Sequence, residues 1–368
     1  MKAADRRRLR RARMSALGLS PALGSPAAPA SALEVVHHLG ALQAQDYQSG
    51  VWSLGVRSGL TLAEVEEAVL RREIVRTWPM RGTLHWVAAE DARWMTRLLA
   101  GRVLGSIGAR YRQLGLTERE VATAGRLFEE HLHEPMSRPD VAALLARAGI
   151  DASGQRAYHL VGHHCMTGLL CQGPLIGKQP SFVLIDAWVP LSRNPTREEG
   201  LALVAERYVR GHGPVTEGDL ANWVGGTLTL AREALGQLGD RIVKEEVDGQ
   251  TWLTHVDAPA PSGAPDAVHL LPQWDELLLG YRSRDVTLPD EHTARVVPGR
   301  NMVFQPTVVV DGEVAGIWKR RAANGATMVE VTPLTRPTAR ARRGIEASGA
   351  AYGRFLGHDV DVRITGED

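Results

Sequence analysis

The sequence predicts a mainly α-helical protein with β wings, an α+β class with three tandem winged helix-turn-helix motifs and a C-terminal β-rich unit. Two observations support this prediction. Apolar residues at helical spacing recur over the first two thirds of the 368-residue chain, in groups of helices that are each followed by β-prone runs. After about residue 258, short β-prone segments separated by tight turns replace the helical pattern.

The first winged helix is expected within residues 30–115. Helices are predicted over 31–45, 47–59 and 61–73, and the last begins with Thr61 and Glu64 at the spacing of a capping box. Two β-prone runs then flank a tight turn at Met80, Arg81 and Gly82. Three helices followed by a hairpin are typical of a winged helix.

The same order of elements recurs twice. A second motif within residues 116–192 has helices predicted over 117–132, 137–149 and 154–170, followed by the strand-like stretch 175–190. A third motif within residues 193–258 has helices predicted over 196–213, 216–225 and 227–240. Its hairpin, 242–255, turns at Asp248-Gly249, and Thr216 is expected to cap the second helix.

The two ends of the chain differ from this plan. Residues 1–29 form a basic N-terminal segment, and a Pro/Ala/Gly-rich linker spans about 258–267. The C-terminal β-rich unit is placed at 265–368, with strands at 267–272, 302–310, 312–320 and 327–334 and a helix near 342–355. Tight turns are predicted at Asp311-Gly312 and Asn324-Gly325.

The composition is that of an ordinary globular protein, with 44% hydrophobic and 23% charged residues. A net charge of +1 argues against a sequence-blind nucleic-acid coat. Of 43 basic residues only four are lysine, and the arginines cluster at 6–13 and 336–343. Arginine suits phosphates and base edges, although a GC-rich coding bias explains its abundance equally well.

Cellular context is inferred from what the sequence lacks. Cys165 and Cys171 give neither a disulfide framework nor a metal quartet, which favours a reducing cytoplasm. No apolar run reaches the roughly 18–20 residues that cross a bilayer, and no apolar h-region follows the basic N-terminus. We therefore expect a cytoplasmic protein with no membrane partner. The winged-helix plan favours DNA binding, with protein interaction as the alternative.

Four stretches carry a more specific resemblance: "LQAQDYQSGVWSLGVR", "VRTWPMRGTLHWVAAEDARWM", "HLLPQWDELLLGYRSRD" and "VVVDGEVAGIWKRR". Together they resemble, in the same order, the winged-helix superfamily of bacterial DNA glycosylases typified by AlkZ and its relative YcaQ. The resemblance spans about residues 30–330. It implies three winged helices and a β-barrel-like end arranged around DNA, and hydrolysis of the N-glycosidic bond of alkylated purines, with crosslink unhooking in some members.

The resemblance also implies the catalytic residues. The AlkZ-like branch has a Gln-Φ-Gln motif and the YcaQ-like branch has Gln-Φ-Asp. Here the motif is Gln43-Ala44-Gln45, and Asp46 lies one position beyond the YcaQ-like place. On a continuous helix residues i and i+2 point about 200° apart. We therefore expect the helix to end near Gln43, so that both amides reach one cleft. The alternative is that the two glutamines have no catalytic role and form a polar helix end in contact with solvent.

Other residues are candidates for DNA contact. Arg81, Thr83 and His85 belong to the first wing, where Arg81 is expected to meet a phosphate and His85 the site. The alternative is an ordinary hairpin in which Thr83 and His85 simply share one face. Lys319, Arg320 and Arg321 precede a predicted turn, and a basic hairpin tip suits a DNA groove, with a solvated turn as the alternative.

Further polar residues favour structural roles. Asp275, in the same stretch as Tyr281 and Arg282, is expected to cap a helix or pair with arginines rather than to act as a second acid. The run His163-His164-Cys165 favours helix packing over a metal site, because adjacent histidines point to different sides of a helix. Trp78, Trp86 and Trp94 are expected in the core or at interfaces.

The sequence therefore predicts a monomeric, monofunctional DNA glycosylase that requires no cofactor and no metal. Its substrate is expected to be double-stranded DNA with N7-alkylated purines or interstrand crosslinks. No lysine lies near the motif in sequence to form a Schiff base, so cleavage of the abasic strand is not expected. The alternative is a non-catalytic winged-helix DNA-binding protein, such as a regulator.

Overall fold

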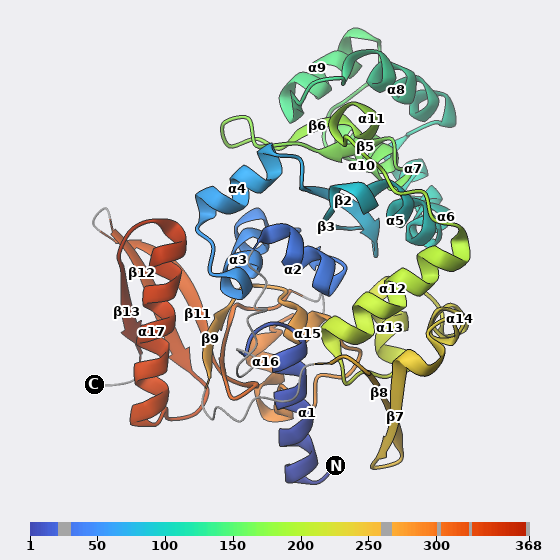
Figure 1. The fold of residues 1–368 in the computed structure, drawn as a ribbon. Coiled ribbons are helices and arrows are strands. Elements are labelled where there is room, and N and C mark those ends of the chain that lie inside the picture. The colour runs from blue at the N-terminus through green and yellow to red at the C-terminus, as the bar shows by residue number, and fades with distance from the viewer. Residues whose placement is uncertain (21–30, 259–266, 300–302, 324–325, 366–368) are drawn as a thin grey trace. The chain divides into compact units, whose positions relative to one another are not determined.

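The computed structural model describes residues 1–20, 31–258, 267–299, 303–323 and 326–365 (Figure 1). The chain forms two compact units. The first comprises residues 1–65, 204–223 and 227–368, and the second comprises residues 66–203 and 224–226. The five-part division drawn from the sequence stays a prediction.

The basic N-terminal segment contains a helix that the sequence had not predicted, α1 (Ala3–Ala16). Its arginines do not form a uniformly solvated face. Leu9 and Leu17 at 0% exposure and Met14 at 3% are buried, and so is Arg13 at 1%. The helix is therefore part of the folded first unit. Residues 21–30, which follow it, lie outside the described residues.

The first winged-helix segment has the predicted order of elements. These are α2 (Ala32–Leu39), β1 (Leu42–Gln43), α3 (Tyr47–Ser58), α4 (Leu62–Leu70), β2 (Ile74–Met80) and β3 (Thr83–Ala88). Thr61 and Glu64 form the predicted capping box. The hairpin turns at Arg81 and Gly82, whose φ angles of +57° and +69° fit a tight two-residue turn.

The first predicted helix was too long. It ends at Leu39, earlier than the apolar pattern to residue 45 and earlier than the end expected near Gln43, because Gly40 adopts a φ of +83° and breaks the helix. A Cβ at Gly40 would also lie 3.3 Å from the Arg207 Cβ and 3.4 Å from the Trp223 ring, which is tighter than ordinary contact. Residue 40 must therefore be glycine, and this glycine releases the next six residues, 41–46, from helical geometry.

The second unit is built on one antiparallel sheet. After η1 (Ala89–Asp91) come its helices α5 (Ala92–Leu99), α6 (Gly101–Ser106), α7 (Gly108–Leu114), α8 (Glu118–His131), α9 (Arg138–Arg147), α10 (Arg156–Met166) and α11 (Ile185–Trp188). Its later strands are β4 (Met136–Ser137), β5 (Leu170–Gln172) and β6 (Ser181–Leu184). Within this unit the strand order is β3-β2-β5-β6-β4, with Ile74 opposite Ala88 and Leu170 opposite Leu184.

Two expectations for this unit were inexact. Only 181–184 of the strand-like stretch 175–190 is a strand, and residues 185–188 turn into α11. Residue 170, expected at the end of a helix, begins β5. Trp78, Trp86 and Trp94 are buried as predicted, and the Trp94 indole donates to Asp91 at 2.8 Å.

The third winged-helix segment also follows the prediction. It contains α12 (Arg197–His212), α13 (Glu217–Val224), α14 (Leu228–Gly236), η2 (Gly239–Arg241) and the hairpin of β7 (Ile242–Val247) and β8 (Gln250–His255). The turn is Asp248-Gly249, both with positive φ. Thr216 caps α13 as expected, since its hydroxyl accepts from the Asp219 N–H and Asp219 accepts from the Thr216 N–H.

The C-terminal part is an open sheet of five strands in the order β13-β12-β11-β10-β9, a half-barrel with β9 and β13 at its edges. Its elements are β9 (Val268–Leu271), α15 (Glu276–Leu279), η3 (Asp290–His292), α16 (Thr293–Val296), β10 (Thr307–Val310), β11 (Glu313–Ala323), β12 (Ala326–Pro333), α17 (Ala339–Leu356) and β13 (Val360–Ile364). The long α17 connects the parallel strands β12 and β13 and packs against the sheet (Figure 1).

The predicted strand 302–310 begins only at Thr307, while Met302 and the expected turn at Asn324-Gly325 lie outside the described residues. The turn at Asp311-Gly312 is present, with φ angles of +49° and +77°. The order of helices and hairpins, with a half-barrel at the end, confirms the predicted α+β fold class. Among the helices that the structure describes, none combines the length and apolar character that a bilayer crossing requires.

Aromatic side chains fix α3 against α17 and the half-barrel. The Trp52 ring lies 4.9 Å from both the Tyr352 and the Phe355 rings, and Tyr352 also contacts Trp318 at 5.2 Å. The two indole N–H groups donate to successive carbonyls at the end of β9, Trp52 to Leu270 and Trp318 to Leu271. The helix that follows the glutamine motif is therefore rigidly held.

Candidate active site

The two glutamines of the motif lie in the short connection between α2 and α3. Gln43 ends the two-residue strand β1, and Gln45 directly precedes Asp46, the N-cap of α3. The Asp46 carboxylate accepts from the Ser49 N–H at 2.8 Å, which fixes where α3 begins. Since the connection is not helical, residues 43 and 45 are not forced onto opposite faces of a helix.

The side chain of Gln43 turns back onto this connection. Its exposed fraction is 7%, and its Oε1 accepts a hydrogen bond from the Gln45 N–H at 2.5 Å. A backbone N–H can only donate, so the partner must be the amide oxygen and the Gln43 NH₂ group is directed elsewhere. Gln45 is half-buried. One glutamine thus fixes the backbone of the other.

A buried carboxylate that the sequence analysis had not singled out holds the motif from behind. Glu276, at 1% exposure, accepts from the Gln43 N–H through Oε1 at 3.2 Å. Its Oε2 accepts from the Trp223 Nε1–H at 3.0 Å and lies 3.3 Å from the His212 Nε2. Glu276 therefore connects β1 to α12 and α13, which are distant in sequence. A charged residue next to three leucines was the signal that could have identified it.

The adjacent Asp275 has a different role. Its carboxylate binds the Arg57 guanidinium through two hydrogen bonds, at 2.8 and 2.9 Å, and both side chains are almost completely buried. It also accepts from the Leu277 N–H and caps α15. Both contacts are those expected of a structural residue, so the interpretation as a cap and arginine partner is confirmed by the geometry.

Two tyrosines hold His212, which lies beside Glu276. The Tyr208 ring stacks on His212, with centroids 4.6 Å apart, and its hydroxyl donates to the Gly280 carbonyl at 2.6 Å. The Tyr281 hydroxyl donates to the His212 carbonyl at 2.7 Å. Burial raises the pKa of Tyr208 and of Tyr281, so both phenols stay protonated. They act as fixed donors rather than as acids or nucleophiles.

The basic residues of β11 have local partners. Lys319 and Arg321 are about half exposed and pair with Glu330 on β12, at 3.9 and 3.1 Å. Arg320 hydrogen-bonds Tyr352 on α17; burial raises the pKa of that phenol, while Arg320 opposes the shift and Asp46 adds to it. Arg320 and the N-cap of α3 therefore lie in the neighbourhood of the same tyrosine.

The candidates of the first wing form a cluster within the second unit. The Arg81 Nη2 lies 2.9 Å from the His85 Nε2, and the His85 Nδ1 lies 2.9 Å from the Thr83 carbonyl oxygen. His85 is completely buried, whereas Arg81 and Thr83 are half-buried. The imidazole therefore orients Arg81, and the part of these three residues in DNA binding stays a prediction.

Comparison with known proteins identifies the family. The family model described as DNA glycosylase AlkZ-like matches residues 36–355, which is most of the chain. The chain belongs to the AlkZ-like DNA glycosylase family. It is therefore an enzyme that acts on DNA, and the regulator considered from the sequence is set aside.

Two comparisons with proteins of Streptomyces sahachiroi agree with this. A relative named interstrand DNA cross-link repair glycosylase is 26% identical over 310 residues, covering 80% of this chain and 83% of the relative. The solved structure of Streptomyces sahachiroi DNA glycosylase AlkZ matches with a TM-score of 0.80 at 24% identity, covering 99% of this chain and all of that one. The second likeness shows that the two folds are the same.

The histidine pair of the glycosylase packs helices, as predicted. The His163 Nδ1 lies 3.0 Å from the Tyr111 hydroxyl, and the His164 Nε2 lies 3.0 Å from the Val121 carbonyl oxygen. Burial lowers the pKa of His164 to about 4.

Cys165 and Cys171 are buried thiols, and burial raises the pKa of both, to about 12 for Cys171. Protonated, buried thiols are inert rather than nucleophilic.

Proposed function

We propose that this glycosylase is monofunctional and hydrolyses the N-glycosidic bond of N7-alkylated purines in double-stranded DNA, with Gln43 and Gln45 as its catalytic residues. The observation that supports this most is the paired placement of the glutamines. Both lie in one rigid connection. The Gln43 Oε1 accepts a hydrogen bond from the Gln45 N–H, and the Glu276 carboxylate accepts one from the Gln43 N–H.

This geometry suits a labile lesion. An N7-alkylated purine is already cationic and needs little or no protonation to leave, so the protein must place a water and tolerate an oxocarbenium-like sugar. Amide carbonyl dipoles directed at that sugar lower the barrier, whereas glutamine is too weak a base for much general-base catalysis. A neutral lesion such as uracil would need more assistance to its leaving base than two glutamines provide.

The contacts favour a division of roles between the glutamines. The Gln43 oxygen is engaged by the Gln45 N–H, so Gln43 acts as the orienting residue and offers its NH₂ group. Gln45 is the more exposed of the two, and we propose that its carbonyl accepts a hydrogen bond from the attacking water. With no lysine close to the motif in sequence, the product is an intact abasic strand.

We extend the proposal to bulky lesions, including interstrand crosslinks, since the curated relative is named for crosslink repair. A crosslinked base is tethered to both strands and cannot swing into a closed pocket, so it is processed while roughly stacked. Three cavities of the first unit, of about 920, 400 and 310 Å³, are lined by residues other than the two glutamines.

The test uses two duplexes, one with a single N7-methylguanine and one with a defined N7–N7 crosslink. We expect alkali-labile sites in the first and unhooked single strands in the second, without strand cleavage before alkali. Release from neither duplex would refute the proposed substrate class, and direct strand cleavage would refute the monofunctional reaction. Gel filtration of the same sample tests the proposed monomer.

A further inference from the structure

The two arginine clusters of the sequence meet at one cavity of the first unit, of about 310 Å³. Arg7 and Arg10 contribute from α1, and Arg336 contributes from the segment between β12 and α17. The other lining residues are mainly apolar and come from β10, β11, β12 and α17; they include Val308, Val310, Val331 and Ile345. We call this the arginine cavity. It contains neither glutamine of the motif.

The wall formed by α1 is firmly attached to the sheet. Arg10 pairs with Glu313, and the Arg11 Nε lies 3.4 Å from the Asp311 Oδ1, so both sides of the β10–β11 turn bind the helix. Gly312 between them has a φ of +77°, and a Cβ there would lie 3.1 Å from the Arg10 Cβ. The close approach of helix and turn therefore depends on this glycine, and it gives the cavity a fixed shape.

Positive charge is in excess at this cavity. Its two acids, Asp311 and Glu313, are each already paired with an arginine of α1. Arg7 and Arg336 are exposed and have no hydrogen-bond or ion-pair partner within the described parts of the chain, and the buried Arg10 Nε also has none there. Burial lowers the pKa of Arg10, because its charge is partly removed from water.

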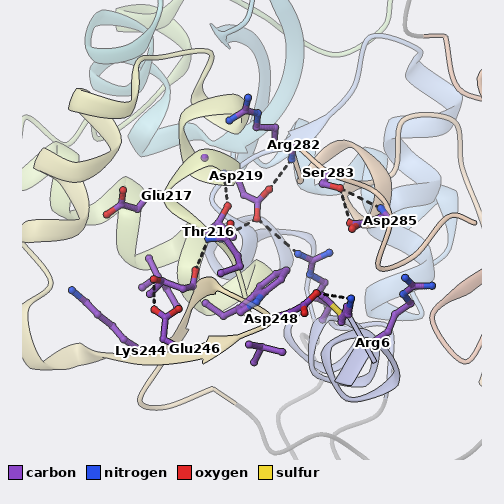
Figure 2. A pocket seen from close by; sticks show the side chains of 18 of the residues that line it. Arg6, Thr216, Glu217, Asp219, Lys244, Glu246, Asp248, Arg282, Ser283 and Asp285 are labelled. Carbon is purple, nitrogen blue, oxygen red and sulfur yellow. Dashed lines mark hydrogen bonds and ion pairs between the residues drawn. The ribbon is translucent and has the colours of Figure 1, made fainter. Parts of the chain in front are cut away.

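A larger cavity of the same unit, about 920 Å³, lacks this excess (Figure 2). Its basic side chains are Arg6, Arg13, Lys244 and Arg282. Its acids are Glu217, Asp219, Glu246, Asp248 and Asp285, so acids are at least as numerous as bases around it. Arg6 and Arg7 are neighbours on α1 but line different cavities, which provides a natural control.

We propose that the arginine cavity binds a phosphate group of the DNA backbone, at a site separate from the glutamine motif. Guanidinium groups bind phosphate oxygens in pairs, and the apolar floor offers a surface for the adjoining deoxyribose. About 310 Å³ is at the lower end of ligand pockets, which suits one sugar-phosphate unit. The site adds affinity without sequence preference, as a lesion-searching enzyme requires.

The test compares two double variants of the full chain. Arg7→Ala with Arg336→Ala removes the two unpaired cations of the cavity. Arg6→Ala with Arg343→Ala removes the same charge from the same two segments but spares the cavity, which Arg343 does not line. Affinity for an undamaged duplex is measured by fluorescence anisotropy across a salt series, and thermal melting confirms that both variants fold.

Each phosphate contact steepens the fall of log affinity with log salt concentration by about 0.9. Each contact is therefore worth roughly eightfold in affinity at 0.1 M salt relative to 1 M salt. We expect the cavity variant to lose one to two such contacts and the control variant to stay within about twofold of wild type. Equal losses in both variants, or none in either, would overturn the proposal. A third result would also overturn it: inorganic phosphate raises the melting temperature of wild type but not of the cavity variant, while the two proteins bind DNA equally well. Because binding alone is measured, the result is independent of the catalytic role of the glutamines.

Discussion

Substitution of Glu276 by glutamine tests how the motif is held. The carboxylate uses both oxygens, one for the Gln43 N–H and one for the Trp223 indole N–H, and both of these groups can only donate. The amide of Glu276→Gln keeps the shape but has one oxygen. Either Gln43 or Trp223 then faces an NH₂ group instead of an acceptor, inside a site that is 1% exposed.

The cost follows from these contacts. One hydrogen bond to a charged acceptor contributes about 1.5–3 kcal/mol, and an unsatisfied buried donor costs a further 1–3 kcal/mol. We therefore expect the free energy of unfolding to fall by about 2.5–6 kcal/mol. At roughly 2–4 °C per kcal/mol for a unit of this size, Tm falls by about 5–24 °C. Misplacement of a reacting group by about 1 Å costs on the order of a hundredfold in rate.

The assay is the single-turnover rate of N7-methylguanine release at 20 °C, where the variant is still folded, together with DNA affinity. We expect Glu276→Gln to lower the rate by about 10–100-fold, by the misplacement argument above, with affinity almost unchanged. Asp275→Asn is the matched control, because it breaks the buried pair with Arg57 without touching the motif. A wild-type rate for Glu276→Gln, or an equal loss of rate in both variants, would refute the positioning role.

Three further predictions address packing, pH and DNA contact. Burial lowers the pKa of His164 from its ordinary 6.5 to about 4, so the unfolded chain takes up a proton first as pH falls. The stability contributed by neutral His164 is therefore present above pH 6.5 and is lost between pH 6.5 and 4, by up to about 3 kcal/mol. Urea unfolding of His164→Gln should show a flatter dependence of stability on pH. Gly55→Ala should cost about 1–3 kcal/mol in chemical denaturation, because a Cβ there would overlap the Phe355 ring, and an unchanged midpoint would contradict this packing. Lys319→Ala with Arg321→Ala should reduce the salt dependence of DNA binding, since both cations are about half exposed; an unaltered slope would place the β11 residues away from DNA.

Local patterns in the sequence were sufficient for most of the fold. The capping residues Thr61 and Thr216 mark the starts of helices, and the Asp248-Gly249 and Asp311-Gly312 turns mark hairpins, because each depends on contacts within a few residues. The apolar pattern continues past Gly40, so the early end of α2 was missed; it depends on packing against Arg207 and Trp223, which are far away in sequence.

The candidate site was predictable only in part. The glutamines were proposed from a motif, whereas Glu276 was missed because its partners are separated from it by 53 to 233 positions along the chain. Asp275 and Glu276 are adjacent carboxylates at the same end of an apolar run. Only the tertiary structure shows that one binds Arg57 and the other binds Gln43.

The measurement that tests the central claim most directly is a comparison of wild type with Gln45→Ala and Gln43→Ala. Each protein is assayed for single-turnover release of N7-methylguanine from a duplex and for affinity to the same duplex. The account predicts unchanged affinity within about threefold, a rate reduced on the order of a hundredfold or more by Gln45→Ala, and a smaller reduction by Gln43→Ala. A wild-type rate in both variants would show that the chemistry lies elsewhere in the glycosylase.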